Sequence, residues 1–312
     1  MNKILILIYR IIVPLFIRKR FSTYKKWTIL RYLKKNMEDG TEKQKIIDFL
    51  KRNPFEAFTF PYDFVDDIRK KHIEVWTDAD NGAKYVEHQG KRMYFPMTWD
   101  KNQIQDYYIG LLIEQYKDSP HLYETADFCV QNGDTIADIG AAEGIFALSN
   151  VEKAKKIFLF ECDEQWIEAL KRTFEPYKEK VVITNKLVSD KSINEISHNN
   201  QGGNQHNRHT YTPPPPTITI DDFLGETEIN FIKADIEGME KQLLLGAKKT
   251  LINQKNLKLS ICAYHRHNDA KDLKDILTQY GYKTHYSKGY MIASHDILLP
   301  PYLRHGIIRA KK

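Results

Sequence analysis

The sequence has few cysteines for its 312 residues. Only Cys129, Cys162 and Cys262 occur, and no two of them form a C-x-x-C pair. An odd number of isolated cysteines argues against a disulfide framework and against a structural zinc site of paired cysteines. We therefore expect the protein to work in a reducing compartment.

A long uninterrupted apolar run is also absent. The apolar stretch near the start, residues 4–17, is 14 residues long and is interrupted by Arg10 and Pro14. A spanning helix needs about 20 predominantly apolar residues. A signal peptide needs an unbroken apolar region followed by a small-residue cleavage site. The sequence predicts neither.

Acidic residues are missing from the first 35 positions, which carry ten Lys or Arg side chains. The remaining residues hold 37 basic and 41 acidic side chains, so the body gives no support to nucleic-acid binding. Basic charge beside apolar residues is typical of a segment that lies on an anionic membrane surface. A helix packed on the protein's own core is the alternative, and the sequence leaves both open.

Strand-like and helix-like patterns alternate through the second half of the chain. Strands are predicted at 135–140, 156–161, 180–189, 229–235 and 257–265, and helices at 143–154, 163–177, 238–253 and 269–281. This alternation predicts an α/β fold with a doubly wound, mostly parallel sheet and helices on both faces. Upstream, residues 41–75 are predicted as broken helices, 84–95 as a hairpin and 102–116 as a helix. The polar stretch 198–216 is predicted to be a loop.

The first predicted strand leads into the turn DIGAAEG, residues 138–144, which lacks the G-x-G-x-x-G pattern of dinucleotide-binding sites. Gly140 and Gly144 are expected to let the backbone pass close to a ligand at the start of the next helix. A carboxylate at Asp138 repels phosphates and suits a cationic ligand. We therefore expect S-adenosylmethionine (SAM) rather than NAD, bound by Asp138, Gly140, Ala141 and Gly144.

A second acid supports this interpretation. Glu161 ends the second predicted strand, 23 residues after Asp138. An acid in that place is how Rossmann-like folds bind ribose hydroxyls. The end of the third strand should flank the adenine; the sequence does not fix the residue, and Leu187 is our candidate.

Several blocks of the chain resemble the FkbM methyltransferases, SAM-dependent enzymes with the class I, Rossmann-like fold. The blocks are IADIGAAEGIFAL, IFLFECDEQWIEALKRTF, TITIDDF, FIKADIEGMEKQLLLGA and LSICAYHRHNDAKDLKDIL. The fourth is close to the family's K-x-D-x-E-G-x-E pattern. The resemblance spans most of residues 84–290 and does not reach the first 80. We therefore expect three parts: a basic arm (1–35), an extension of helices and a hairpin (36–125) and a SAM-binding methyltransferase domain (126–312).

The resemblance implies methylation of a hydroxyl, often on a sugar in polysaccharide, glycolipid or secondary-metabolite pathways. Asp235 and Glu237 follow the fourth predicted strand and His265 ends the fifth, so these side chains should lie at the same edge of the sheet as SAM. Because a hydroxyl nucleophile benefits from a base, we predict Asp235 as base or metal ligand and His265 as base or acceptor-orienting group. Lys233 shares a face with Asp235 and is a candidate partner for it.

Other roles for these residues stay open. Asp235 and Glu237 are candidate ligands for Mg²⁺, which prefers carboxylates. Alternatively, Glu237 caps the following helix. Lys233 and Glu240 are then a buried ion pair, and His265 is an ordinary polar residue.

Two other classes of protein compete with an O-methyltransferase. The first is a nicotinamide-dependent oxidoreductase on a similar sheet, which the missing G-x-G-x-x-G argues against. The second is a non-catalytic membrane-surface protein that keeps the fold, which the intact candidate residues argue against. We expect a cytoplasmic enzyme, peripheral on the inner face of the membrane, that acts on a sugar or glycolipid acceptor. The sequence predicts neither the acceptor's identity nor the oligomeric state.

Overall fold

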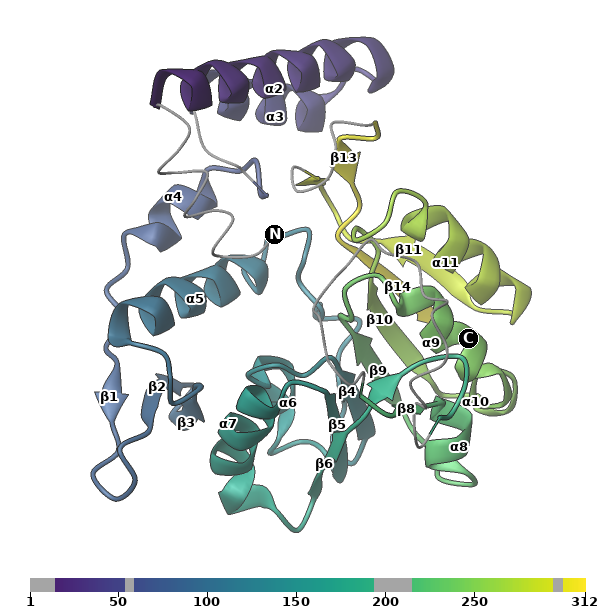
Figure 1. Ribbon diagram of the computed structural model, residues 1–312. Coiled ribbons are helices and arrows are strands. Elements are labelled where there is room, and N and C mark those ends of the chain that lie inside the picture. Colours follow the sequence, from purple (N-terminus) through teal and green to yellow (C-terminus); the bar gives the residue numbers. More distant parts are fainter. Residues whose placement is uncertain (1–14, 54–58, 194–214, 294–299) are drawn as a thin grey trace, which may run out of the picture.

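The centre of the protein is a seven-stranded sheet in the order β11-β14-β10-β9-β4-β5-β6 (Figure 1). The computed structural model describes residues 15–53, 59–193, 215–293 and 300–312, with side chains of the first helix from residue 23 onward. The strands of the sheet are β4 (Thr135–Ile139), β5 (Lys156–Glu161), β6 (Val181–Asn185), β9 (Phe231–Ala234), β10 (Lys258–Cys262), β11 (Lys283–Tyr286) and β14 (Ile307–Lys311). Neighbours from β10 to β6 are parallel, and β14 runs antiparallel to β10 and β11. The predicted α/β class with a mostly parallel sheet is confirmed.

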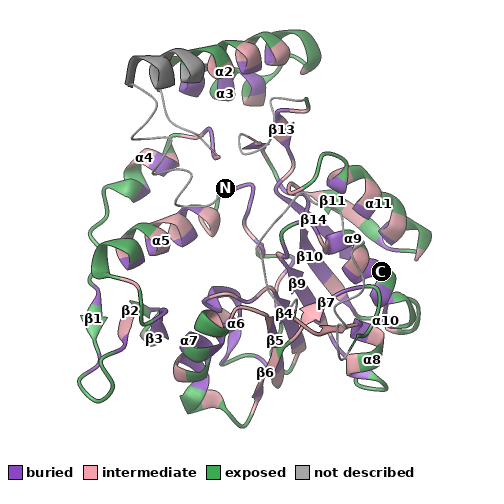
Figure 2. Cartoon of the chain, in the orientation of Figure 1, coloured by how far each residue is buried: buried purple, intermediate pink, exposed green. Residues whose placement is uncertain are grey.

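Helices cover both faces of this sheet (Figure 1). One face packs on α5 (Lys101–Glu114), α6 (Ile145–Asn150) and α7 (Glu164–Phe174). A short 3₁₀ turn (Glu175–Tyr177) follows α7. The other face packs on α8 (Ile220–Leu224), α9 (Glu240–Gly246), α10 (Lys248–Asn253) and α11 (Asp269–Gln279). Successive strand residues point to opposite faces, so Ile136 joins the first core and Ile139 the second. Both faces of the strands are therefore buried (Figure 2).

The winding of the sheet reverses between β4 and β9. From β4 the chain continues to β5 and β6 on one side, and it later returns to β9 and β10 on the other. In doubly wound sheets, ligands bind outside the carboxyl ends of the strands at such a point. The ends of β4 and β9 are therefore where a site is expected.

Two predicted elements differ from the structure. The strand expected over 180–189 divides into β6 and β7 (Leu187–Val188), and β7 leaves the main sheet to pair with β8 (Thr217–Ile218). The helix expected over 238–253 divides at Ala247 into α9 and α10. Gly246, the last residue of α9, packs closely on the segment after β7, since a Cβ there would lie 2.1 Å from the Ser189 carbonyl oxygen.

The extension before the sheet contains the predicted hairpin and helix. The hairpin is β2 (Lys84–His88) and β3 (Lys91–Tyr94), joined by β1 (Trp76–Thr77) in a three-stranded sheet. Helix α5 begins with a capping box between Asp100 and Gln103. A further pair of short strands, β12 (Met291–Ile292) and β13 (Leu303–Arg304), lies near the C-terminus.

The N-terminal helices are α2 (Leu15–Asn36), α3 (Thr41–Arg52) and α4 (Phe64–Arg69). Ile29 and Leu33 of α2 are buried in a cluster with α3 and the C-terminal segment. The later part of the predicted arm therefore packs on the protein, while residues 1–14 lie outside the described part. Among the described helices, none is both long and apolar enough to cross a membrane.

Candidate active site

The turn after β4 is held by backbone contacts with β5 and β9. The N–H groups of Gly140 and Ala141 both donate to the carbonyl of Phe160, over 2.9 and 3.0 Å. Gly140 has a positive φ of 72°, and a Cβ there would lie 1.9 Å from the carbonyl oxygen of Asp235. The turn therefore packs directly on the backbone of Asp235, the residue that follows β9.

The reason for the two glycines differs from the one predicted. We expected them to make room for a ligand, but protein atoms occupy the space beside each. A Cβ on Gly144 would lie 2.8 Å from the Phe174 ring and 2.9 Å from Leu170 of α7. Packing of the turn on its own strands and helix is therefore enough to require glycine at both positions.

Glu161 connects the ends of β4 and β5. One carboxylate oxygen accepts from the backbone N–H of Ala142 over 2.9 Å, and the other accepts from Cys162 and Asp163 over 2.7 and 2.8 Å. The side chain is only partly buried. Its role as the ribose-binding acid stays a prediction, as does the contact of the adenine with Leu187, which lies half-buried in β7.

Asp138 and Lys233 do not behave as predicted. They are directly paired in the register of β4 and β9, and Lys233 Nζ lies 2.9 Å from Asp138 Oδ1. Both side chains are almost fully buried. Lys233 therefore pairs with Asp138 rather than with Asp235 or Glu240, and Asp138 neutralises a lysine instead of facing a cationic ligand.

Lys233 also contacts both the turn after β4 and Tyr123, which belongs to the polar network around Asp235. Its ammonium donates to the carbonyl of Gly140 over 2.7 Å and lies 5.1 Å from the centre of the Tyr123 ring. Burial lowers its pKa, but the Asp138 charge outweighs this and raises the pKa above its ordinary value. Lys233 stays protonated and acts as a positioning residue, which excludes it as a base.

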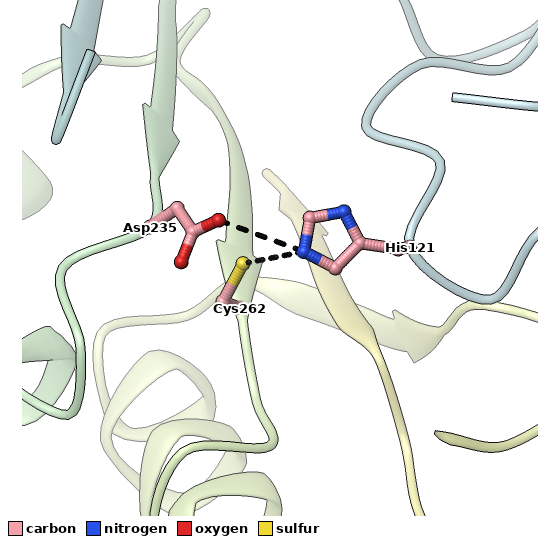
Figure 3. Close-up of side chains that lie close together, drawn as sticks. All are labelled: His121, Asp235 and Cys262. Carbon is pink, nitrogen blue, oxygen red and sulfur yellow. Dashed lines mark hydrogen bonds and ion pairs between the residues drawn. The ribbon is translucent and has the colours of Figure 1, made fainter. Parts of the chain in front are cut away.

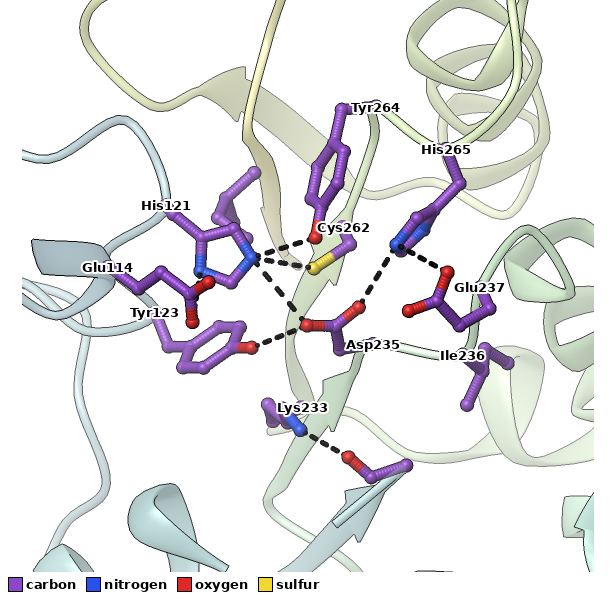
Figure 4. A network of polar contacts seen from close by, with 12 residues as sticks. Glu114, His121, Tyr123, Lys233, Asp235, Ile236, Glu237, Cys262, Tyr264 and His265 are labelled. Atoms are coloured by element: carbon purple, nitrogen blue, oxygen red, sulfur yellow. Dashed lines mark hydrogen bonds and ion pairs between the residues drawn. The ribbon is translucent and has the colours of Figure 1, made fainter. Parts of the chain in front are cut away.

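Asp235 lies at the centre of a network of polar side chains (Figure 4). Its Oδ2 accepts from the Tyr123 hydroxyl over 2.9 Å and lies 3.6 Å from His121 Nε2. Its Oδ1 lies 3.2 Å from His265 Nε2. Burial alone would raise the pKa of Asp235, but the contacts with His121 and His265 hold it well below the ordinary range. Asp235 is therefore a carboxylate at neutral pH.

His265 is held between two carboxylates. Its Nδ1 lies 2.8 Å from Glu240 Oε1, opposite the contact of Nε2 with Asp235. Burial lowers the pKa of His265, but Asp235 and Glu240 together raise it well above its ordinary value. The predicted proximity of Asp235 and His265 is present, although His265 lies three residues beyond the end of β10.

Glu237 lies at the edge of this network. Its side chain is 72% exposed, its nearest oxygen is 3.9 Å from His265 Nε2, and its φ is 53°. Helix α9 begins at Glu240 with Met239 as its N-cap, so the alternative role of Glu237 as the cap is wrong.

The predicted Mg²⁺ site of Asp235 and Glu237 finds no support. Within the described ranges, two groups of three side chains converge closely enough to hold a metal: His121, Asp235 and Cys262, and Asp235, Glu240 and His265. Neither contains Glu237, and each includes a nitrogen or sulfur donor. Mg²⁺ requires oxygen ligands, so this chemistry does not suit it.

Sequence reasoning missed the residues that approach from the extension. His121 and Tyr123 lie between α5 and β4 and reach across to Asp235, while Tyr264 follows β10. Tyr107 of α5 donates to Glu143 of the turn over 2.8 Å. Burial raises the pKa of Glu143 to about 7. His121 and Tyr123 belong to the short motif SPHLYE, residues 119–124, between α5 and β4. This motif has neither a helical nor a strand periodicity, so the pattern gave no reason to assign its residues to the site.

A hollow of about 680 Å³ lies away from this network, between β3 and α7. Four basic residues, Lys91, Arg92, Lys171 and Arg172, line it, and three of them lie near an acid. Arg92 lies 3.5 Å from Asp78, and Lys171 and Arg172 lie 2.7 and 4.0 Å from Glu168. The hollow shares no lining residue with the site, and we assign it no role.

Residues 138–284 match the model of the methyltransferase FkbM domain. The chain contains an FkbM methyltransferase domain. This confirms the resemblance found in the sequence and, with the strand order, the class I methyltransferase fold. The match also identifies the domain as that of a SAM-dependent methyltransferase, but it does not identify the acceptor.

The solved structures that match the chain have low sequence identity to it, and three of them are methyltransferases with the following values. Methyltransferase FkbM from Methylobacillus flagellatus is 18% identical, with a TM-score of 0.46 over 66% of this chain and 52% of that one. This chain thus spans about half of its length. A precorrin-6y C5,15-methyltransferase from Geobacter metallireducens is 12% identical, with a TM-score of 0.37 over 58% and 81%. An rRNA methylase from Streptococcus thermophilus is 12% identical, with a TM-score of 0.35 over 59% and 89%. No curated protein matches the chain.

Proposed function

We propose that this domain methylates a hydroxyl of a sugar in a glycan, a glycolipid or a related metabolite. The observation that carries the proposal is the contact between the turn after β4 and the residue after β9. Gly140 lies directly against the Asp235 backbone, so the predicted cofactor turn and the polar network around Asp235 adjoin. A cofactor at the turn and an acceptor at the network then meet at one edge of the sheet.

The charges around the turn fit SAM better than a dinucleotide. Glu161 bonds to the backbone of the turn, and Asp235 lies against it. Lys233, the cation beside the turn, is already neutralised by Asp138. Such an excess of carboxylates favours a ligand with a sulfonium and an ammonium, and it opposes the diphosphate of NAD. The turn, Glu161 and Leu187 are the residues we expect to hold SAM, which supplies an electrophilic methyl group.

The paired groups of the network suit a hydroxyl acceptor. Asp235 is ionised at neutral pH and 22% exposed, so it can accept a hydrogen bond from an incoming hydroxyl. Its low pKa makes it a weak base, but the proton of a hydroxyl becomes far more acidic as the oxygen is alkylated. His265, held in place by Glu240, orients the carboxylate. Asp235 therefore receives the proton, and His265 is a positioning residue.

A labelled-methyl assay tests this proposal. The full chain is incubated with methyl-labelled SAM and a panel of sugar nucleotides, lipid-linked sugars and polysaccharide fragments. Transfer should give a base-stable methyl ether on a sugar, identified by mass spectrometry. A base-labile ester or a methylated nitrogen would contradict the hydroxyl acceptor.

Variants of the network separate catalysis from folding. Asp235→Asn should lower turnover on the true acceptor by about 10²–10⁴-fold, the usual contribution of a base. Asp272→Asn is the matched control, because Asp272 is a partly exposed acid that lies outside the network and is paired with Lys241. Equal turnover in the Asp235 and Asp272 variants would remove Asp235 from the reaction. A full chain that binds SAM but transfers no methyl group to any member of the panel would favour the non-catalytic alternative.

We also propose that the N-terminal arm holds the enzyme at an anionic membrane surface. Residues 23–36 of α2 contain five Lys or Arg and no acid. Tyr24 and Trp27 are 57% and 56% exposed, while Ile29 and Leu33 face α3. Exposed aromatic and basic side chains together are typical of interfacial helices. Each Lys or Arg near such a surface contributes about 1 kcal/mol.

Vesicle co-sedimentation tests this placement. The full chain should bind anionic vesicles, ignore neutral ones and dissociate as salt increases. A variant with Arg31, Lys34 and Lys35, which are exposed, changed to Gln keeps the buried face of α2 and should bind more weakly. Equal binding to neutral vesicles, or no binding at all, would contradict the membrane role.

A further inference from the structure

Three polar atoms converge on one ring nitrogen of a fully buried histidine (Figures 3 and 4). The Nε2 atom of His121 lies 3.2 Å from the Tyr264 hydroxyl, 3.5 Å from Cys262 Sγ and 3.6 Å from Asp235 Oδ2. His121 comes from the segment between α5 and β4. Asp235 and Cys262 each follow the last registered pair of β9 and β10, Ala234 and Ile261.

Hydrogen bonding does not account for this convergence. A ring nitrogen either donates one hydrogen bond or accepts one, so it cannot satisfy a thiol, a carboxylate and a hydroxyl together. The other ring nitrogen, Nδ1, has no hydrogen-bond partner among the described residues. A cation between Nε2, Sγ and Oδ2 would coordinate all three atoms at once, although it would not contact Nδ1.

We propose that His121, Asp235 and Cys262 bind a zinc ion. A tetrahedral zinc with ordinary bond lengths places sulfur about 3.6 Å from nitrogen and oxygen about 3.4 Å from nitrogen. The distances of 3.5 and 3.6 Å are close to these values, and the three ligand atoms all lie within 4.8 Å of one another. Thiolate and imidazole are ligands that zinc accepts and that Mg²⁺ and Ca²⁺ do not.

The surroundings of the three ligands fit a metal site. Ligating histidines usually direct their second nitrogen to a carboxylate, and Glu114 Oε2 lies 4.0 Å from His121 Nδ1. The Tyr123 hydroxyl donates to the Asp235 oxygen that would bind the metal. Binding breaks the S–H bond of Cys262; its electron pair forms the sulfur–zinc bond and the proton goes to solvent.

Three protein ligands leave a fourth position open, which is the pattern of catalytic zinc sites. Asp235 is partly exposed, so an oxygen of water or of the acceptor can reach that position. Zinc there would lower the pKa of a bound hydroxyl. This role rests on the proposed function, whereas binding of the ion does not.

Metal titration of the full chain tests the proposal. The protein is stripped with a chelator and titrated with Zn²⁺ against a competing indicator, and in parallel with Co²⁺. We expect one ion per chain, and for Co²⁺ the near-ultraviolet charge-transfer band of a thiolate ligand. Binding of fewer than one ion per chain, or a Co²⁺ spectrum without that band, would overturn the proposal.

Matched variants assign the ligands. Cys262→Ser and His121→Ala should abolish stoichiometric binding, whereas Cys129→Ser and His72→Ala, the same changes outside the cluster, should leave it unchanged. Stoichiometric binding retained by folded Cys262→Ser would refute the site.

Calorimetry with SAM on the same samples keeps the two proposals apart. SAM binding without zinc binding would refute the metal site alone. Zinc binding without SAM binding would refute the proposed function and leave the site standing. Thermal melting of each variant verifies that it folds. The cobalt spectrum is measured on the unaltered chain, so this test of the thiolate ligand does not depend on whether a variant folds.

Discussion

The two sides of the site are constructed differently. At the ends of β4 and β5, backbone groups make the contacts: Gly140 and Ala141 donate to Phe160, and Glu161 accepts from three backbone N–H groups. At the ends of β9 and β10, side chains make them, and they come from segments far apart in the chain. The proposed cofactor side is a property of the strand and turn, whereas the proposed acceptor side depends on which side chains meet.

This difference has consequences for substitution. A backbone-held turn tolerates changes of side chain except where a Cβ cannot fit, as at Gly140. A network of buried charges depends on every member, because removing one leaves another unpaired. The Lys233 ammonium contacts both sides, since it bonds to Gly140 and lies over Tyr123.

The largest effect should therefore come from Lys233→Met. The change leaves the fully buried Asp138 carboxylate without its partner, which costs about 3–5 kcal/mol of stability. Urea unfolding measures it. The double variant Lys233→Met/Asp138→Leu should recover much of the loss.

Lys241→Met is the control, since the Lys241–Asp272 pair is partly exposed. Pairs of that kind contribute about 0–1 kcal/mol. If Lys233→Met and Lys241→Met lower stability equally, Lys233 does not connect the two sides.

A somewhat smaller effect is expected from Glu143→Gln, and it should depend on pH. Burial raises the pKa of Glu143 from 4.5 to about 7, so between these values the native state keeps a proton that the unfolded state releases. Wild-type stability therefore falls as pH rises through this window, by about 3 kcal/mol at 1.36 kcal/mol per pKa unit. Glu143→Gln lacks this loss, so its stability relative to the wild type should increase from pH 4 to pH 8.

Urea unfolding at several pH values measures the trend. Glu179→Gln alters an exposed glutamate and should follow the wild-type curve. A Glu143→Gln curve parallel to both would show that the turn does not bury a protonated acid.

The smallest effect concerns SAM binding to Glu161→Ala. Loss of one hydrogen bond to a charged acceptor costs about 1.5–3 kcal/mol, or about 10–150-fold in affinity. Isothermal calorimetry measures it, with Glu164→Ala, three residues later and exposed, as the control. Unchanged affinity in folded Glu161→Ala would place the cofactor elsewhere.

Local pattern was sufficient to predict the sheet and the turn that follows β4. The alternating strands and helices, the hairpin around Gln89-Gly90 and the acid at the end of β5 follow from short stretches of sequence. The partner of Lys233 was not predictable, because it depends on the register of β9 against β4. His121 was missed because its meeting with Asp235 joins residues more than a hundred positions apart.

Calorimetric titration of SAM into the wild type and Asp235→Asn tests the central claim most directly. That claim is that the turn after β4 binds the cofactor while the network around Asp235 serves the acceptor. We predict saturable binding of SAM with the same affinity in both proteins, and none of NAD. A folded wild type that binds NAD but not SAM, or an Asp235→Asn variant that folds yet loses SAM binding, would contradict it.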